Sequence, residues 1–310
     1  MSRIHEALKK AEQERAAVVT AEAESVASPM DPVVAASAPK SEAIPSIEDV
    51  MARTVSAAPS GYLRFDDLRA KCAHPEWHLD ENVNVFANPA LAARGAEQFR
   101  TLRSRLYQMR SSQTLKTLLI TSSIPTEGKT FVTNNLAQAI IRQPDRRALI
   151  IDADLRRSRL HVPLGAPSTP GLTDYLRGTA DMVSIIQQGH EGNLCLIPGG
   201  DEVTNPSELL SNGRLKILLD RLTPIFDWII LDSPPCLLVA DASVLADHCD
   251  GVLLVARAGV TPAATAQRAV QELRGRNVVG VVLNAMQESH SYHAGYYYGY
   301  DYGEGKETNG

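Results

Sequence analysis

Between residues 116 and 286, short apolar segments alternate with stretches of helical pattern. Each segment is continuously apolar, which is typical of strands that are covered on both faces. Strands interleaved with helices predict an α/β fold with a mostly parallel sheet, right-handed crossovers and helices on both faces. The strands are expected within residues 116–123, 147–154, 193–200, 227–235, 251–259 and 277–286.

Outside this region the pattern predicts little packed structure. Ser2 is a suitable N-cap for a short charged helix, on which only Ile4 and Leu8 share an apolar face. The next segment is rich in Ala, Ser, Pro and Glu and buries too little to offset its ordering entropy. The pattern predicts a helix at 1–17, a disordered linker at 18–61, an unassigned stretch at 62–88, the folded domain at 89–290, opening with a helix, and a flexible tail at 291–310.

The composition narrows the class of protein. A net charge of −5 over 310 residues gives no electrostatic case for a nucleic-acid partner. The four cysteines show neither metal-ligand spacing nor the density of a disulfide scaffold, so reduced thiols in the cytoplasm are expected. No apolar run reaches the ~20 residues that span a bilayer. We therefore expect a cytoplasmic protein that reaches the inner membrane only through a partner.

One segment matches a phosphate-binding loop. Residues 123–130 read S-I-P-T-E-G-K-T, which is G-x-x-x-x-G-K-[ST] with Ser123 in place of the first glycine. The segment follows an expected strand and opens a helix, so its amides point at anionic oxygens. Lys129 is expected to contact the β and γ phosphates and Thr130 to bind Mg²⁺. We expect the P-loop NTPase type of fold, with ATP contacted by Ser123, Thr126, Glu127, Gly128, Lys129, Thr130 and Phe131.

Acidic residues end two of the expected strands. Asp152 and Asp154 are two residues apart, which places both carboxylates on one side of an extended backbone, and Asp232 follows four apolar residues. Buried carboxylates need a cation, which Mg²⁺ supplies. We expect Thr130, Asp154 and Asp232 on the metal side, and Lys129, Asp152 and Asp154 in catalysis, with Asp152 positioning or deprotonating the attacking hydroxyl. The alternative for Asp154 is a helix cap or a pair with Arg156.

Together these residues resemble a bacterial tyrosine kinase of the exopolysaccharide-synthesis type. The resemblance covers roughly residues 90–302 and rests on the loop, on "LIIDADLRR", on "IILDSPP" and on a tyrosine-rich tail. The segment "SRIHEALKKAEQ" is similar to that of the exosortase-associated subgroup. The resemblance implies Mg²⁺–ATP as phosphate donor and a separate transmembrane polysaccharide co-polymerase as partner. It also implies subunit contacts through the E-x-x-R-x-x-R residues Glu97, Arg100 and Arg103, for which a solvated helix face with i,i+3 pairing is the alternative. It further implies an adenine contact at Asn284, for which a structural side-chain cap is the alternative.

Two positions bear on that resemblance. Family loops often carry glycine where this chain has Thr126, and a threonine there is strained if the position needs a positive φ. Partition and septum-site ATPases carry an extra lysine where this chain has Ile124, and its absence favours the kinases.

The tail supplies candidate acceptors. A glycine-rich segment can present several phenols to one active site, and each added phosphate brings nearly two negative charges that repel neighbouring tails. The expected autophosphorylation sites are Tyr292, Tyr296, Tyr297, Tyr298, Tyr300 and Tyr302. The sequence thus predicts an autokinase that forms a homo-oligomer. The alternatives are an ATPase switch that acts on water, an inactive nucleotide-bound regulator, and a sticky low-complexity tail without phosphorylation.

Overall fold

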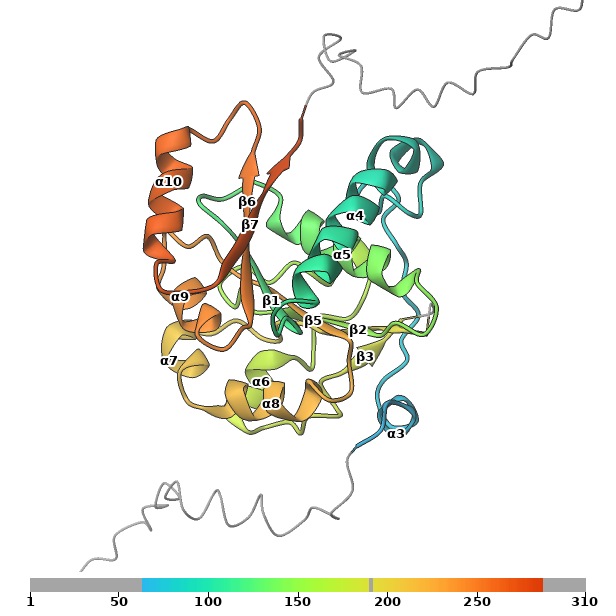
Figure 1. Cartoon of the computed structure of the whole chain (residues 1–310). Coiled ribbons are helices and arrows are strands. Elements are labelled where there is room, and N and C mark those ends of the chain that lie inside the picture. The colour runs from blue at the N-terminus through green and yellow to red at the C-terminus, as the bar shows by residue number, and fades with distance from the viewer. Residues whose placement is uncertain (1–62, 190–191, 287–310) are drawn as a thin grey trace, which may run out of the picture. The chain divides into compact units, whose positions relative to one another are not determined.

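The computed structural model describes residues 63–189 and 192–286. Its sheet has seven strands in the order β3-β4-β2-β5-β1-β6-β7, and only β3 runs antiparallel to its neighbour (Figure 1). The expected α/β fold with a mostly parallel sheet is confirmed. The strands are β1 Thr117–Ser122, β2 Ala148–Asp152, β3 Gln187–Gln188, β4 Leu194–Ile197, β5 Trp228–Asp232, β6 Gly251–Arg257 and β7 Val278–Asn284.

Helices cover both faces of the sheet. Neighbouring residues of β1 face opposite ways: Leu118 packs in the core layer below α4 and α5, whereas Leu119 packs in the layer below α6, α8, α9 and α10. All six residues of β1 are buried, which explains why its centre, Leu118 to Ile120, is continuously apolar and does not alternate. The helices are α3 Phe65–Arg69, α4 Pro89–Arg110, α5 Lys129–Ile141, α6 Leu172–Arg177, α7 Pro206–Leu210, α8 Arg214–Leu222, α9 Asp241–Ala246 and α10 Ala263–Glu272, with a short 3-10 turn at Val162–Leu164.

The folded unit extends towards the N-terminus beyond Pro89. Phe65 and Leu68 of α3 are buried in the core, and the side chain of Asn84 is fully buried. The Asn84 amide donates to the carbonyl of Pro163 at 2.6 Å, and its oxygen accepts from Asn134 and Gln138 of α5, each at 2.6 Å. The stretch that the sequence left unassigned is therefore bonded to the helix that follows the phosphate-binding loop.

The strand ends bring the acidic residues together. β5 lies between β1 and β2, and Asp152 at the end of β2 is the register partner of Asp232 at the end of β5. The loop that precedes α5 leaves the same end of β1. The carboxyl end of the sheet, where ligands of such folds bind, therefore carries every expected strand-end residue. Across the described ranges, no helix has the length and apolar character needed to cross a membrane.

Candidate active site

The phosphate-binding loop joins β1 to the amino end of α5. Gly128 is the N-cap of α5 and has a left-handed backbone with φ 94°. The amides of the first turn of α5 have no acceptors within the helix, so together with the helix dipole they favour an anion. Thr126 also has a positive φ, of 66°. This is the backbone conformation in which a threonine at this position was expected to be strained. A β-branched residue in this region is strained, at about 1–3 kcal/mol.

Lys129 is held by an acid of the second motif. Its ammonium lies 2.9 Å from the carboxylate of Asp154, and both side chains are largely buried. Burial lowers the pKa of Lys129, but the charges of Asp232 and Asp154 outweigh burial, so that the pKa lies above its usual 10.5. Lys129 is therefore a fixed cation at the amino end of α5.

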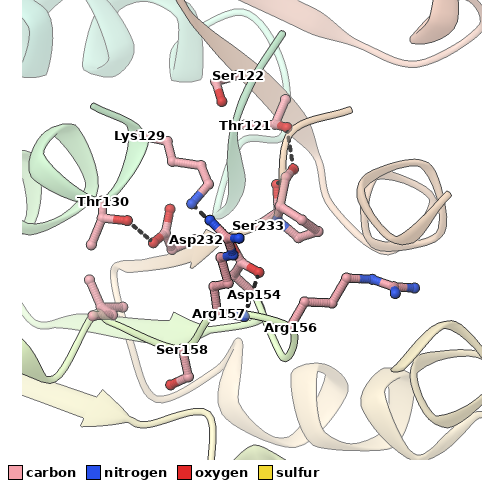
Figure 2. Close-up of polar contacts among 12 residues, drawn as sticks. Thr121, Ser122, Lys129, Thr130, Asp154, Arg156, Arg157, Ser158, Asp232 and Ser233 are labelled. Carbon is pink, nitrogen blue, oxygen red and sulfur yellow. Dashed lines mark hydrogen bonds and ion pairs between the residues drawn. The ribbon is translucent and has the colours of Figure 1, made fainter. Parts of the chain in front are cut away.

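Thr130 makes the second contact. Its hydroxyl donates to Asp232 at 2.6 Å, and Figure 2 shows this contact beside the pair of Lys129 and Asp154. Burial, partly offset by the charge of Lys129, raises the pKa of Asp232 from 3.8 to about 6. Burial and then the charge of Asp232 raise the pKa of Asp152 to about 7. The two adjacent carboxyls therefore disfavour each other's charge.

Asp152 also orders the loop that follows β2. Its carboxylate accepts from the Ser158 hydroxyl at 2.7 Å and from the Leu160 amide at 2.8 Å. Asp154 accepts from the amide of Arg157 at 3.1 Å, so it caps the turn in addition to pairing with Lys129. Asp152 thus holds the turn that follows β2, and Asp154 both caps this turn and pairs with Lys129.

The donor set fits a magnesium nucleotide. Three buried carboxylates, of Asp152, Asp154 and Asp232, lie near one partly buried cation, Lys129, which leaves an excess of negative charge that a divalent ion would offset. In the part of the chain that the structure describes, no cluster of three or more His, Cys, Asp or Glu could hold a metal ion by itself. This agrees with the usual Mg²⁺ site of a P-loop, which takes one or two protein ligands and completes its shell with phosphate and water.

The other residues of the expected nucleotide set have different surroundings, and two of them, Glu127 and Asn284, form hydrogen bonds with the loop. The Glu127 side chain is buried and its Oε2 accepts from the Ile124 amide at 2.9 Å. The Asn284 amide donates to the carbonyl of Glu127 at 2.9 Å, which is the contact of a structural cap. The Ser123 hydroxyl is buried without a hydrogen-bond partner among the described residues. Phe131 packs edge-on against Phe99 of α4.

Arg156 does not pair with Asp154. Figure 2 shows it pointing away from the acidic cluster, and its Nε donates to the fully buried Asp241 at 2.8 Å. Ser207 donates to the same carboxylate. Arg156 thus ties the loop after β2 to the amino ends of α7 and α9. Sequence reasoning missed this contact because the partners are 85 residues apart.

The three residues of the expected subunit contact have different surroundings. Glu97 and Arg100 form an exposed i,i+3 ion pair on α4. Arg103 instead reaches α5, where it donates to the carbonyl of Ala139 at 2.6 Å. Arg103 therefore has an intramolecular role at the carboxyl end of α5. The expected acceptor tyrosines, 292 to 302, lie outside the described residues.

The sheet, the loop and the acidic strand ends define a P-loop nucleotide-binding protein. No family model matches the chain. It is 38% identical over 213 residues to the tyrosine-protein kinase Etk of Escherichia coli K12, a match that covers 67% of this chain but 29% of that protein. It is 34% identical over 217 residues to the tyrosine-protein kinase YwqD of Bacillus subtilis, covering 69% of this chain and 91% of YwqD.

A solved structure agrees. The kinase domain of Escherichia coli Etk superposes with a TM-score of 0.61 at 35% identity, over 69% of this chain and 86% of that domain. The chain belongs to the bacterial tyrosine kinase family, as its motifs predicted.

Proposed function

We propose that this protein is an ATP-dependent protein-tyrosine autokinase, which transfers the γ-phosphoryl group of Mg²⁺–ATP to tyrosines of its own or a neighbouring subunit's C-terminal tail. One observation carries the proposal: Lys129, Thr130, Asp152, Asp154 and Asp232 converge at the carboxyl end of the sheet, beside the amino end of α5. The names of the relatives, which are tyrosine-protein kinases, support the reaction type.

The residues of the site have three proposed roles. The loop amides and Lys129 bind and neutralise the phosphates, and they favour the charge that develops during transfer. Thr130, Asp154 and Asp232 would hold Mg²⁺, which would supply positive charge to offset that of the phosphates. Asp152 orients the acceptor phenol or takes its proton, because it lies at the end of β2 beside Asp232.

The acceptors and partners follow from the family. Tail tyrosines 292 to 302 are the proposed acceptors, presented between subunits of a homo-oligomer. Accumulated phosphates would repel one another and loosen that assembly. We propose that this cycle regulates exopolysaccharide synthesis or export, with the protein in the cytoplasm and bound at the inner membrane to a separate transmembrane co-polymerase.

A labelling experiment tests the proposal. The full chain, with Mg²⁺ and γ-labelled ATP, is expected to acquire label on tyrosine, and the Lys129→Met variant is expected to lose at least about 99% of it. Lys216→Met is the control, because Lys216 forms only an exposed pair with Asp220 on α8. Phosphate release without labelled protein would identify an ATPase switch instead. If neither labelled protein nor free phosphate appears, even with the membrane partner present, the protein would be an inactive nucleotide-bound regulator.

A further inference from the structure

The last strand reaches the phosphate-binding loop. Asn284 ends β7, and its backbone is fixed beside the end of β6 because its carbonyl accepts from the Ala258 amide at 2.9 Å. From there its side-chain amide donates to the carbonyl of Glu127 at 2.9 Å. Figure 1 shows β6 and β7 side by side, with β7 at the edge of the sheet. A residue more than 150 positions downstream thus bonds to the loop just before Gly128.

Gly128 leaves the space that this contact requires. A Cβ atom at Gly128 would lie 2.0 Å from the amide nitrogen of Asn284, far inside van der Waals contact. Its φ of 94° is also unfavourable for other residues. The glycine of the G-K-T sequence is therefore explained in this chain by the approach of Asn284 as well as by the backbone conformation.

The same glutamate is held from the other side. The buried Glu127 carboxylate accepts from the Thr261 hydroxyl and from the Ile124 amide of its own loop. The Thr261 hydroxyl oxygen in turn accepts from the Arg257 amide at 2.9 Å, at the end of β6. Backbone and side chain of Glu127 are thus both anchored to the ends of the two last strands.

We infer that Asn284 is a positioning residue that fixes the shape of the phosphate-binding loop through the Glu127 carbonyl, with Thr261 fixing the Glu127 side chain. This inference rests on the proposed triphosphate binding and assigns Asn284 to the phosphate end of the ligand. This contact engages one N–H of the Asn284 amide with the protein backbone, so it acts on the shape of the loop whatever base the nucleotide carries. Loss of Asn284 therefore weakens every triphosphate alike.

A comparison of three ligands tests that prediction. Calorimetry with the full chain measures Mg²⁺–ATP, Mg²⁺–GTP and magnesium tripolyphosphate. For Asn284→Ala all three dissociation constants are expected to rise by a common factor of about five, the effect of one lost hydrogen bond. Asn277→Ala is the matched control, because its amide donates to the Asp250 carbonyl at 2.8 Å near the opposite end of β7. A loss confined to ATP would overturn the inference and identify an adenine contact.

A second measurement does not depend on any ligand. Without nucleotide, amide hydrogen exchange of residues 123–131 is expected to be several-fold faster in Asn284→Ala and in Thr261→Val than in the parent chain, with exchange in β1 unchanged. Asn277→Ala should leave the loop as it was. Unchanged loop exchange in both variants would overturn the inference. Failure of the parent chain to bind any triphosphate would instead contradict the proposed function and leave the exchange result standing.

Discussion

The ammonium of Lys129 lies 2.9 Å from the carboxylate of Asp154, although their elements follow β1 and β2, which β5 separates. The ion pair spans the end of the intervening strand, where Asp232 lies. Phosphate oxygens that bind the loop must therefore compete with Asp154 for Lys129. The pair couples the two sequence motifs of the site directly.

Removing Asp154 is expected to have opposite effects with and without metal. In EDTA, Asp154→Asn should bind ATP about three- to tenfold more tightly, because one negative charge that competes for Lys129 is gone. With Mg²⁺, label transfer should fall by at least about a hundredfold, because a metal-side carboxylate is lost. Titration in the two buffers and a labelling assay measure both.

Asp247→Asn is the control for that experiment, since the Asp247 side chain is exposed and pairs with Arg276, away from the phosphate-binding loop. It should change neither quantity. Weaker binding of metal-free ATP by Asp154→Asn would contradict the competition.

Thr126 offers a test of strain in the loop. With φ 66°, Thr126→Gly should raise the free energy of unfolding by about 1 kcal/mol, as the relief of the left-handed backbone exceeds the added entropy of the unfolded chain. Urea unfolding measures this. Asp145→Gly is the matched control for Thr126→Gly, because Asp145 also has a positive φ, of 60°, but lies in the turn before β2.

The same pair of variants tests whether Thr126 weakens nucleotide binding. If it does, Thr126→Gly will tighten Mg²⁺–ATP binding and Asp145→Gly will not. Equal affinity in both would mean that the strained threonine is compatible with full binding, and the inactive-regulator alternative would lose its basis.

The buried carboxyl of Asp232 predicts that the stability of the metal-free protein depends on pH. The folded state raises the pKa of Asp232 from 3.8 to about 6, so between these values it binds more protons than the unfolded chain. The stabilisation that comes from the neutral form of the Asp232 carboxyl is therefore present below about pH 4 and is lost as the pH rises through 6. Asp232→Asn should gain on the order of 1–3 kcal/mol relative to the parent chain at pH 8, and roughly a third of that at pH 4.5.

Urea unfolding in EDTA at the two pH values measures this difference. Adding Mg²⁺ and ATP at pH 8 should stabilise the parent chain more than the variant, because the charged carboxylate then has a cation to bind. A variant that is less stable than the parent at pH 8 would show that the attraction of Lys129 outweighs burial.

The E-x-x-R-x-x-R residues are expected to separate into two classes. Arg103→Ala should lower the free energy of unfolding by about 1–2 kcal/mol, because it removes a charged donor from a carbonyl near the end of α5. Glu97→Ala and Arg100→Ala should each change it by less than about 0.5 kcal/mol, since their pair is exposed. Chemical unfolding measures stability, and light scattering measures subunit number.

An oligomer that persists in Glu97→Ala and Arg100→Ala, while Arg103→Ala loses both stability and assembly, would assign the motif to folding instead of subunit contact. Loss of assembly in all three, with stability lost only in Arg103→Ala, would support the family expectation.

The sequence predicted the features that local pattern encodes. Six apolar runs located six strands, and five of them, β1, β2, β4, β5 and β6, are buried along nearly their whole length, as expected of strands covered on both faces. The same expectation was wrong for β7, which is the edge strand and exposes Val281 and Leu283. Strand β3 was missed because its two residues, Gln187 and Gln188, are too short and too polar to form such a run. The possible strain at Thr126 was visible in the sequence, because the phosphate-binding loop is recognised from eight consecutive residues and Thr126 is one of them.

Polar contacts between distant segments carried no such signal. Asn134, Asn135 and Gln138 resemble the solvent face of α5, yet all three are buried. Arg103 and Asn284 likewise bond to carbonyls of segments far away along the chain. A carbonyl acceptor is present at every residue, so the sequence alone gives no indication of which one a side chain will reach.

The bonds of Asn84 also set the limits for shorter versions of this protein. A fragment that starts at Pro89, where the helical pattern begins, would remove the acceptor of the Asn134 and Gln138 amides and uncover the part of α5 that Asn84 covers. Each lost hydrogen bond is destabilising by about 0.5–1.5 kcal/mol, and α5 carries the lysine and threonine of the loop. Recombinant fragments should therefore retain the chain from Leu63 onward, and those cut at Pro89 should aggregate or lose affinity for nucleotide.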